Sequence, residues 1–86
     1  MNLLFSPHAW DDYLYWQKQD KKVIKRINRL IEDSTRQPTS GIGKPEALKE
    51  NLSGYWSRRI TDEHRLVYSF SEETLTIVSL RYHYSK

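Results

Sequence analysis

A run of chain-breaking residues near the middle of the chain limits the folds that it can adopt. Pro38, Gly41, Gly43 and Pro45 cannot together sustain a helix or a strand. The residues before this run recur with the periodicity of helices, whereas those after it show the alternation of strands. We therefore predict a loop over residues 35–45 that separates a helical segment from a β-rich second half.

The first predicted helix begins at Ser6-Pro7. A serine side chain accepts bonds from the amides of a first helical turn, and proline tolerates the first helical position. This helix is expected to end at Gln17 or Gln19. Its apolar side chains recur at helical spacing, so this stripe is predicted to face the core, with base stacking as the alternative role. The stripe consists of Trp10, Tyr13 and Leu14.

A second helix is predicted from the cap Asp20 to about Ser34, and the tight connection implies an antiparallel helical hairpin. Its apolar stripe is Val23, Ile24, Ile27, Leu30 and Ile31. Its basic side chains on the other faces are Lys21, Lys22, Lys25, Arg26 and Arg29. Residues 21–36 carry a net charge of +4, within a chain of net charge +3. Such a face favours a polyanion, and an ordinary solvated helix face is the alternative.

The remaining pattern predicts strands. Asn2–Phe5 is a short apolar strand, one helical turn is expected over Glu46–Asn51, and three strands follow at about 55–60, 65–70 and 74–82. Alternation is clearest in the middle strand, where Leu66, Tyr68 and Phe70 face one side and Arg65, Val67 and Ser69 the other. The predicted fold is a single α+β domain, residues 1–86, in the order β-α-α-β-β-β. Its antiparallel sheet packs against the N-terminal helical hairpin.

Length and composition limit the size of the hydrophobic core and indicate the cellular compartment. A chain of 86 residues buries only about 60–65% of its unfolded surface, so dimerisation or a partner chain would help to stabilise it. Three Trp, six Tyr and two Phe partly compensate. The absence of cysteine excludes disulfides and fits a reducing cytoplasm. No segment approaches the ~18–20 apolar residues of a membrane span, so no membrane association is expected.

The titratable residues exclude some chemistries. The three His lack metal-ligand spacing and cysteine is absent, which argues against a metal site and against a Cys nucleophile. RNA cleavage needs neither a metal nor a protein nucleophile, because the ribose 2′-OH can itself attack the adjacent phosphorus. It requires a base, an acid and cations that stabilise phosphate charge, and no cofactor. Glu46, His83, Arg59 and Arg65 supply these residue types, although the sequence alone does not show that they meet.

Three motifs carry a family resemblance: Gly-Tyr-Trp-Ser-Arg-Arg-Ile at 54–60, His-Arg-Leu-Val-Tyr at 64–68 and Arg-Tyr-His-Tyr at 81–84. Residues 10–16 and 51–54 match as well. With these motifs the chain resembles the YoeB branch of the RelE superfamily, small bacterial toxins that cleave messenger RNA on the ribosome and so inhibit translation. The resemblance covers nearly the whole chain and implies the α+β fold predicted above.

The resemblance also implies a site. Its catalytic set corresponds to Glu46, Arg65 and His83. Its phosphate- and nucleotide-binding set corresponds to Lys49, Arg59 and Tyr84. Ser85-Lys86 extend past the family's usual terminal tyrosine and could shift Tyr84. Outside this set, Arg58 and His64 are predicted to be structural or peripheral, with Arg58-Arg59 a surface pair in the absence of the family match, and Trp56 is predicted to lie in the core.

The partners that the resemblance implies are messenger RNA on the ribosome, a YefM-like antitoxin and a second copy of the chain. Operator DNA is expected only through the toxin–antitoxin complex. Two other classes stay open. One is a non-catalytic nucleic-acid-binding module that uses the basic second helix, and the other is a module that binds an acidic peptide.

Overall fold

The structure is a computed structural model that describes residues 1–82. The predicted site residues His83 and Tyr84 and the extension Ser85-Lys86 lie outside the described residues. The elements are β1 (Asn2–Phe5), α1 (Pro7–Gln19), α2 (Lys21–Arg36), β2 (Glu46–Ala47), the 3-10 turn η1 (Glu50–Leu52), β3 (Trp56–Arg59), β4 (Arg65–Phe70) and β5 (Thr74–Ser79).

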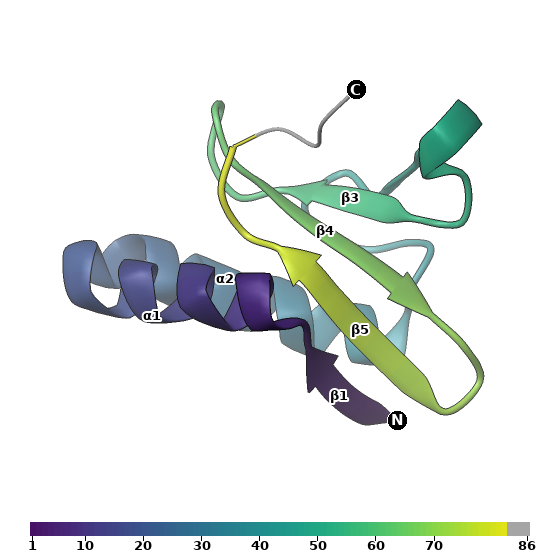
Figure 1. Ribbon diagram of the computed structural model, residues 1–86, viewed down its shortest axis with the longest axis horizontal. Coiled ribbons are helices and arrows are strands. Elements are labelled where there is room, and N and C mark those ends of the chain that lie inside the picture. The colour runs from purple at the N-terminus through teal and green to yellow at the C-terminus, as the bar shows by residue number, and fades with distance from the viewer. Residues whose placement is uncertain (83–86) are drawn as a thin grey trace.

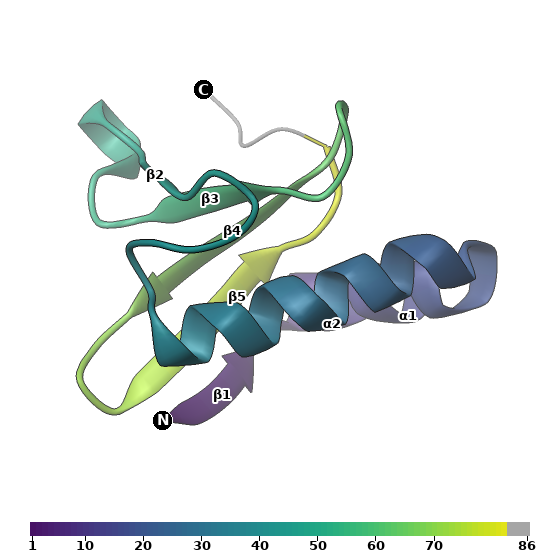
Figure 2. The same cartoon turned by 180° about the vertical axis from the view of Figure 1, so that it is seen from behind.

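The strands form a five-stranded sheet in the order β1-β5-β4-β3-β2 within residues 1–82. β1 pairs parallel to β5, and the other neighbours are antiparallel. Figure 1 shows α1 and α2 side by side along the sheet, and Figure 2 shows β2 at the opposite end of the sheet from β1. The predicted α+β class is confirmed.

Both predicted helix starts are confirmed by their caps. The Ser6 hydroxyl accepts from the amide of Ala9 at 3.0 Å, and Pro7 occupies the first helical position. The Asp20 carboxylate accepts from the amides of Lys22 and Val23 at 3.0 and 3.2 Å. Because Asp20 leaves the helical conformation between the two helices, it ends α1 and begins α2 in one residue.

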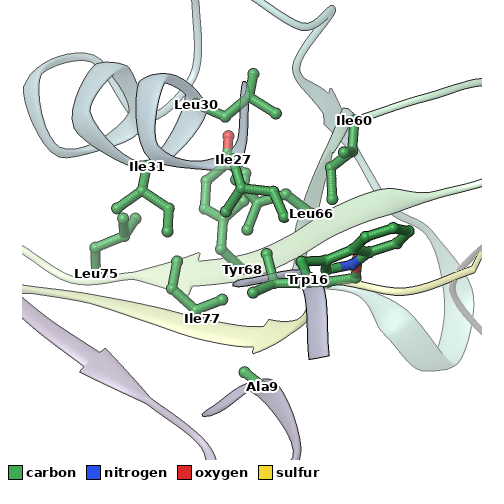
Figure 3. Close-up of a cluster of buried hydrophobic side chains, with 11 residues drawn as sticks. Ala9, Trp16, Ile27, Leu30, Ile31, Ile60, Leu66, Tyr68, Leu75 and Ile77 are labelled. Carbon is green, nitrogen blue, oxygen red and sulfur yellow. The ribbon is translucent and has the colours of Figure 1, made fainter. Parts of the chain in front are cut away.

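The core lies between the helices and one face of the sheet (Figure 3). Buried side chains of α2 meet buried side chains of the strands, and the predicted α2 stripe is confirmed. From α2 come Ile27, Leu30 and Ile31, with Val23 and Ile24 partly buried, and from the strands Leu66, Tyr68, Leu75 and Ile77. Trp56 is partly buried and packs against this cluster, as predicted.

The predicted inward stripe of α1 is wrong for Trp10 and Leu14, whereas Tyr13 is partly buried and packs against the core. Trp10 and Leu14 are 46% and 43% exposed, whereas the helix buries Ala9, Asp12 and Trp16. This second set also recurs at helical spacing, and each member gains a specific contact. Ala9 allows close approach, the Asp12 carboxylate accepts from the buried amide of Leu80 at 2.9 Å, and the Trp16 indole donates to the Leu80 carbonyl at 2.9 Å. These hydrogen bonds offset the cost of burying polar groups. The spacing of apolar residues in the sequence does not reveal such bonds.

The predicted helical turn over Glu46–Asn51 is also wrong. Glu46 and Ala47 form β2 against Ser57 and Trp56, and only Glu50–Leu52 forms a 3-10 turn. Ladder bonds with β3 outweigh the helical propensity of the segment. Other boundaries shift slightly: α2 runs to Arg36, so the loop begins after it. Within residues 1–82 no helix has the length and apolar character needed to cross a membrane.

Candidate functional site

The strand register places three predicted site residues on one face of the sheet. Arg59 of β3 lies directly opposite Arg65 of β4. Glu46 of β2 lies opposite Ser57, which in turn lies opposite Val67. Residues two apart on a strand share a face, so Ser57 and Arg59 share one, as do Val67 and Arg65. Glu46, Arg59 and Arg65 therefore occupy the same face, which we call the site face.

The site face is the one turned away from the helices. Leu66 and Tyr68 of β4, which alternate with the site-face residues, are buried in the cluster formed with α2. Arg58 of β3 likewise points toward α2. Glu46 and Arg59 are exposed on the opposite side. A ligand can therefore approach the predicted site without disturbing the core.

Arg65 is held by one nitrogen of its guanidinium. Its Nη1 donates to the carbonyls of Thr61, Asp62 and His64 at 2.7, 3.1 and 3.1 Å. The side chain is thereby folded against the turn that precedes β4. Within residues 1–82 its Nη2 and Nε make no hydrogen bond. Those two donors form the edge of the fork that binds a phosphate in bidentate fashion.

The charged side chains of the candidate site are not engaged in ion pairs among the described residues. Within residues 1–82, Glu46, Lys49, Arg59 and Arg65 form no ion pair. Lys49 follows β2 closely and is exposed. Arg59 and Arg65 share the site face with the single carboxylate of Glu46, and this net positive charge attracts an anion such as a phosphodiester.

The chain that leads to His83 is attached next to Arg65. The amide of Tyr82 donates to the Nδ1 atom of His64 at 2.6 Å, and the carbonyl of Tyr82 accepts from the Arg65 amide at 3.0 Å. The rings of His64 and Trp16 are nearly perpendicular, with centroids 4.8 Å apart. The predicted site residues beyond this anchor, His83 and Tyr84, lie outside the described residues.

The structure separates Arg58 from its neighbour Arg59. Arg58 is fully buried, so a surface pair of the two arginines is excluded. Its Nη1 lies 2.6 Å from a carboxylate oxygen of Asp33, and its Nε donates to the Tyr68 hydroxyl at 3.0 Å. Its Nη1 and Nη2 also donate to loop carbonyls, namely those of Gln37 at 2.6 Å, Ser40 at 2.8 Å and Ile42 at 3.0 Å. Strand alternation could have found this residue, because Arg58 pairs with the inward-facing Leu66.

This network shifts two pKa values. Hydrogen bonds from Gln37 and Arg58 to the Asp33 carboxylate lower its pKa to about 2, although burial acts in the opposite direction. Burial raises the pKa of Tyr68, and its contact with the Arg58 guanidinium partly offsets this. Asp33 and Arg58 are therefore a charged pair at neutral pH, with Tyr68 as a neutral hydroxyl.

Other features lie away from the site face. Residues 1–82 contain no group of three His, Cys, Asp or Glu side chains that could hold a metal ion. A groove of about 470 Å³ lies beside β1, lined in part by Leu3, Phe5, Trp10 and Tyr13. Its lining is mainly apolar and includes the acidic Glu32 but no basic residue, so it does not suit a phosphate.

The family model for the YoeB-like toxin of bacterial type II toxin–antitoxin systems matches residues 5–84. The chain belongs to the YoeB toxin family. It is 60% identical to the toxin YoeB of Escherichia coli strain K12 over 84 residues, which are 98% of this chain and 100% of the relative. Among solved structures, the YoeB/ParE toxin from Agrobacterium tumefaciens superposes with a TM-score of 0.94 at 46% identity, covering 98% of this chain and 100% of that one.

Two structures from Staphylococcus aureus bear on assembly in the YoeB family. One is a YoeB dimer, with a TM-score of 0.91 and 52% identity over 98% of each chain. The other is a YoeB–YefM complex, with a TM-score of 0.89 and 50% identity over 98% of each chain. The predicted family and fold are thus confirmed, and this chain is a type II toxin–antitoxin toxin.

Proposed function

We propose that this chain is a ribosome-dependent endoribonuclease that cleaves messenger RNA at the A-site codon and thereby inhibits translation. One observation carries the proposal: Glu46, Arg59 and Arg65, from three different strands, share one face of the sheet. Their charges have no ionic partner among residues 1–82. A single domain, residues 1–86, carries the activity in this proposal.

The proposed reaction is an internal transfer at phosphorus. The Glu46 carboxylate removes the proton of the ribose 2′-OH, and the 2′-oxygen attacks the adjacent phosphorus. The bond to the 5′-oxygen breaks, and the His83 imidazolium protonates that leaving oxygen. Each proton transfer by a positioned side chain contributes roughly 10²–10⁴-fold in rate. The steps balance without a metal or a cofactor.

The cations stabilise the charge that develops on the phosphate. Arg65 offers Nη2 and Nε to the non-bridging oxygens while Nη1 holds the side chain in place. Arg59, directly across the strand pair, and Lys49 add positive charge. Tyr84 positions the nucleotide. Preorganised donors of this kind are the largest contribution in many enzymes, because they need no reorganisation during the reaction.

The partners follow from the same family. We propose that a YefM-like antitoxin neutralises this chain, as suggested by the Staphylococcus aureus YoeB–YefM complex. Operator DNA would be bound only by the toxin–antitoxin complex. Both messenger RNA on the ribosome and such a complex place the protein in the cytoplasm.

We also propose that two copies of the chain associate through the apolar side chains beside β1. Leu3, Leu4 and Trp10 are 46%, 56% and 46% exposed, and β1 is an edge strand. A relative in Staphylococcus aureus is a dimer. Trp10→Ala should shift the sedimentation coefficient from dimer to monomer while circular dichroism stays unchanged. A monomeric wild type at micromolar concentration would refute the association.

Mapping transcript 5′ ends after brief induction in a bacterium tests the activity. We expect breaks in translated regions at codon-registered positions, and single-turnover cleavage on programmed ribosomes to fall by roughly 10²–10⁴-fold in Glu46→Ala, Arg65→Ala and His83→Ala. Glu72→Ala, an exposed carboxylate in the turn between β4 and β5, is the matched control. Near-full rates in all three variants would show the assignment to be wrong.

A second candidate is a non-catalytic nucleic-acid-binding module. It is favoured by the basic face of α2, which reaches the site through Arg26, whose Nη2 donates to the Arg59 carbonyl at 3.1 Å. RNA binding without cleaved product, unaffected by Glu46→Ala, would support this candidate. Cleavage that depends on Glu46 would exclude it.

A further inference from the structure

The buried guanidinium of Arg58 holds the loop that leads from α2 to Glu46. All three of its nitrogens donate, and the acceptors include three backbone carbonyls of the loop, those of residues 37, 40 and 42. The Tyr68 hydroxyl adds a bond to the Pro38 carbonyl at 2.6 Å. The Asp33 carboxylate also accepts from the amide of Ile42 at 3.0 Å. One buried side chain and its partners thus fix residues 37–42.

Residues 43–46 then connect this fixed loop to the site by a short, stiff path. The Gly43 carbonyl accepts from the Arg59 amide at 2.7 Å, and Glu46 pairs with Ser57. The two β3 residues that this path contacts, Arg59 and Ser57, are therefore the immediate sequence neighbours of Arg58. Lys44 has a φ of 54°, a left-handed conformation that costs energy for a residue other than glycine. Pro45 restricts the next backbone angle.

Gly43 allows this path because a side chain would not fit there. Its φ is 81°, and a Cβ atom would lie 2.6 Å from Cδ2 of Leu30 and 3.2 Å from Cβ of Arg58. The backbone therefore passes close to Leu30 of the core and to the base of the Arg58 side chain. We therefore expect a displacement of the Arg58 side chain to be transmitted along residues 43–46 to Glu46.

We infer that Arg58 is a positioning residue for the site: it sets the placement of Glu46 relative to Arg59 and Arg65 through the loop. This inference rests on the proposed endoribonuclease function. A buried ion pair is weak evidence for stability, since desolvation of both charges offsets their attraction. The multiple bonds to loop carbonyls give this costly group a role that an apolar side chain could not fill. Misplacement of a reacting group by about 1 Å can reduce a rate by roughly 10²-fold.

Arg58→Lys is the principal test. Lysine keeps a positive charge for Asp33 but lacks the planar fork that reaches the loop carbonyls and the Tyr68 hydroxyl together. At a temperature where urea titration shows the variant to be folded, single-turnover cleavage on programmed ribosomes should be about tenfold to hundredfold slower. Binding of a ribosome complex whose scissile ribose lacks the 2′-OH should stay within about twofold, since Arg59, Arg65 and Lys49 remain.

Two further variants separate positioning from stability. Ile27→Val destabilises α2 through the core without touching the loop network, and it should cleave at the wild-type rate. Tyr68→Phe removes only the hydroxyl that bonds Pro38 and Arg58, and it should slow the chemical step by about threefold to tenfold. Tyr68→Phe also decides the matter if Arg58→Lys does not fold.

Amide hydrogen exchange measures the loop without reference to activity. The amides of Ile42 and Arg59 donate to Asp33 and to the Gly43 carbonyl, so both should exchange about tenfold faster in Arg58→Lys and remain protected in Ile27→Val. If the wild type cleaves no RNA, the proposed function fails, and faster exchange alone still supports the positioning role. A folded Arg58→Lys with the wild-type rate, or unchanged exchange at both amides, would overturn it.

Discussion

Arg58 and Arg59 are adjacent on β3, and their surroundings are opposite. Arg58 is fully buried toward α2 and bonds Asp33, Tyr68 and the loop, whereas the Arg59 side chain is exposed on the site face without an ionic partner among residues 1–82. Strand alternation alone decides which arginine goes where. The contrast shows that two identical neighbouring side chains can be directed to the buried interior and to an exposed face of the same sheet.

The largest expected effect comes from removing the buried member of this pair. Arg58→Met removes the buried cation of the Asp33 carboxylate and leaves only the exposed Arg36 at 3.9 Å, which should lower the free energy of unfolding by about 3–5 kcal/mol in urea titration. Arg59→Met is the matched control and should change it by no more than about 0.5 kcal/mol, because the side chain is exposed. Equal losses in the two variants would mean that burial does not distinguish the two arginines.

A smaller effect should appear in acid. The folded-state pKa of Asp33 is about 2, below the ordinary 3.8, so its stabilising contribution is fully present above about pH 4 and is lost as pH falls toward 2. The shift corresponds to about 2 kcal/mol. Urea titrations of the wild type and of Asp33→Asn between pH 5 and 2 measure it. The wild type should lose more stability than the variant over this window, and parallel curves would contradict the assignment.

Much of the fold follows from local patterns that the sequence displays openly. The caps at Ser6 and Asp20, the apolar stripe of α2 and the inward positions of Leu66 and Tyr68 on β4 each depend on neighbouring residues, and each prediction is confirmed. The inward face of α1 could not be predicted in this way. Its buried Asp12 is satisfied by the amide of Leu80, a contact between residues far apart in the sequence.

In the candidate site, too, the sequence identifies some features and only the structure shows the others. Residue types and the family resemblance identify Glu46, Arg59 and Arg65, but only the strand register shows that they share a face. The role of Arg58 could not be recognised from composition, because a buried arginine is rare unless paired, and its partner Asp33 lies on a different element. The placement of His83 and Tyr84 remains a prediction.

The position of β5 has a consequence for biosynthesis. β5 is internal to the sheet, between β1 and β4, so β1 cannot pair with its neighbour until β5 has been translated. Until then β1 has no partner, and the apolar side of the helical hairpin lacks Leu75 and Ile77. A nascent or prematurely terminated copy that lacks β5 therefore cannot complete its sheet or fully cover the apolar side of the helical hairpin.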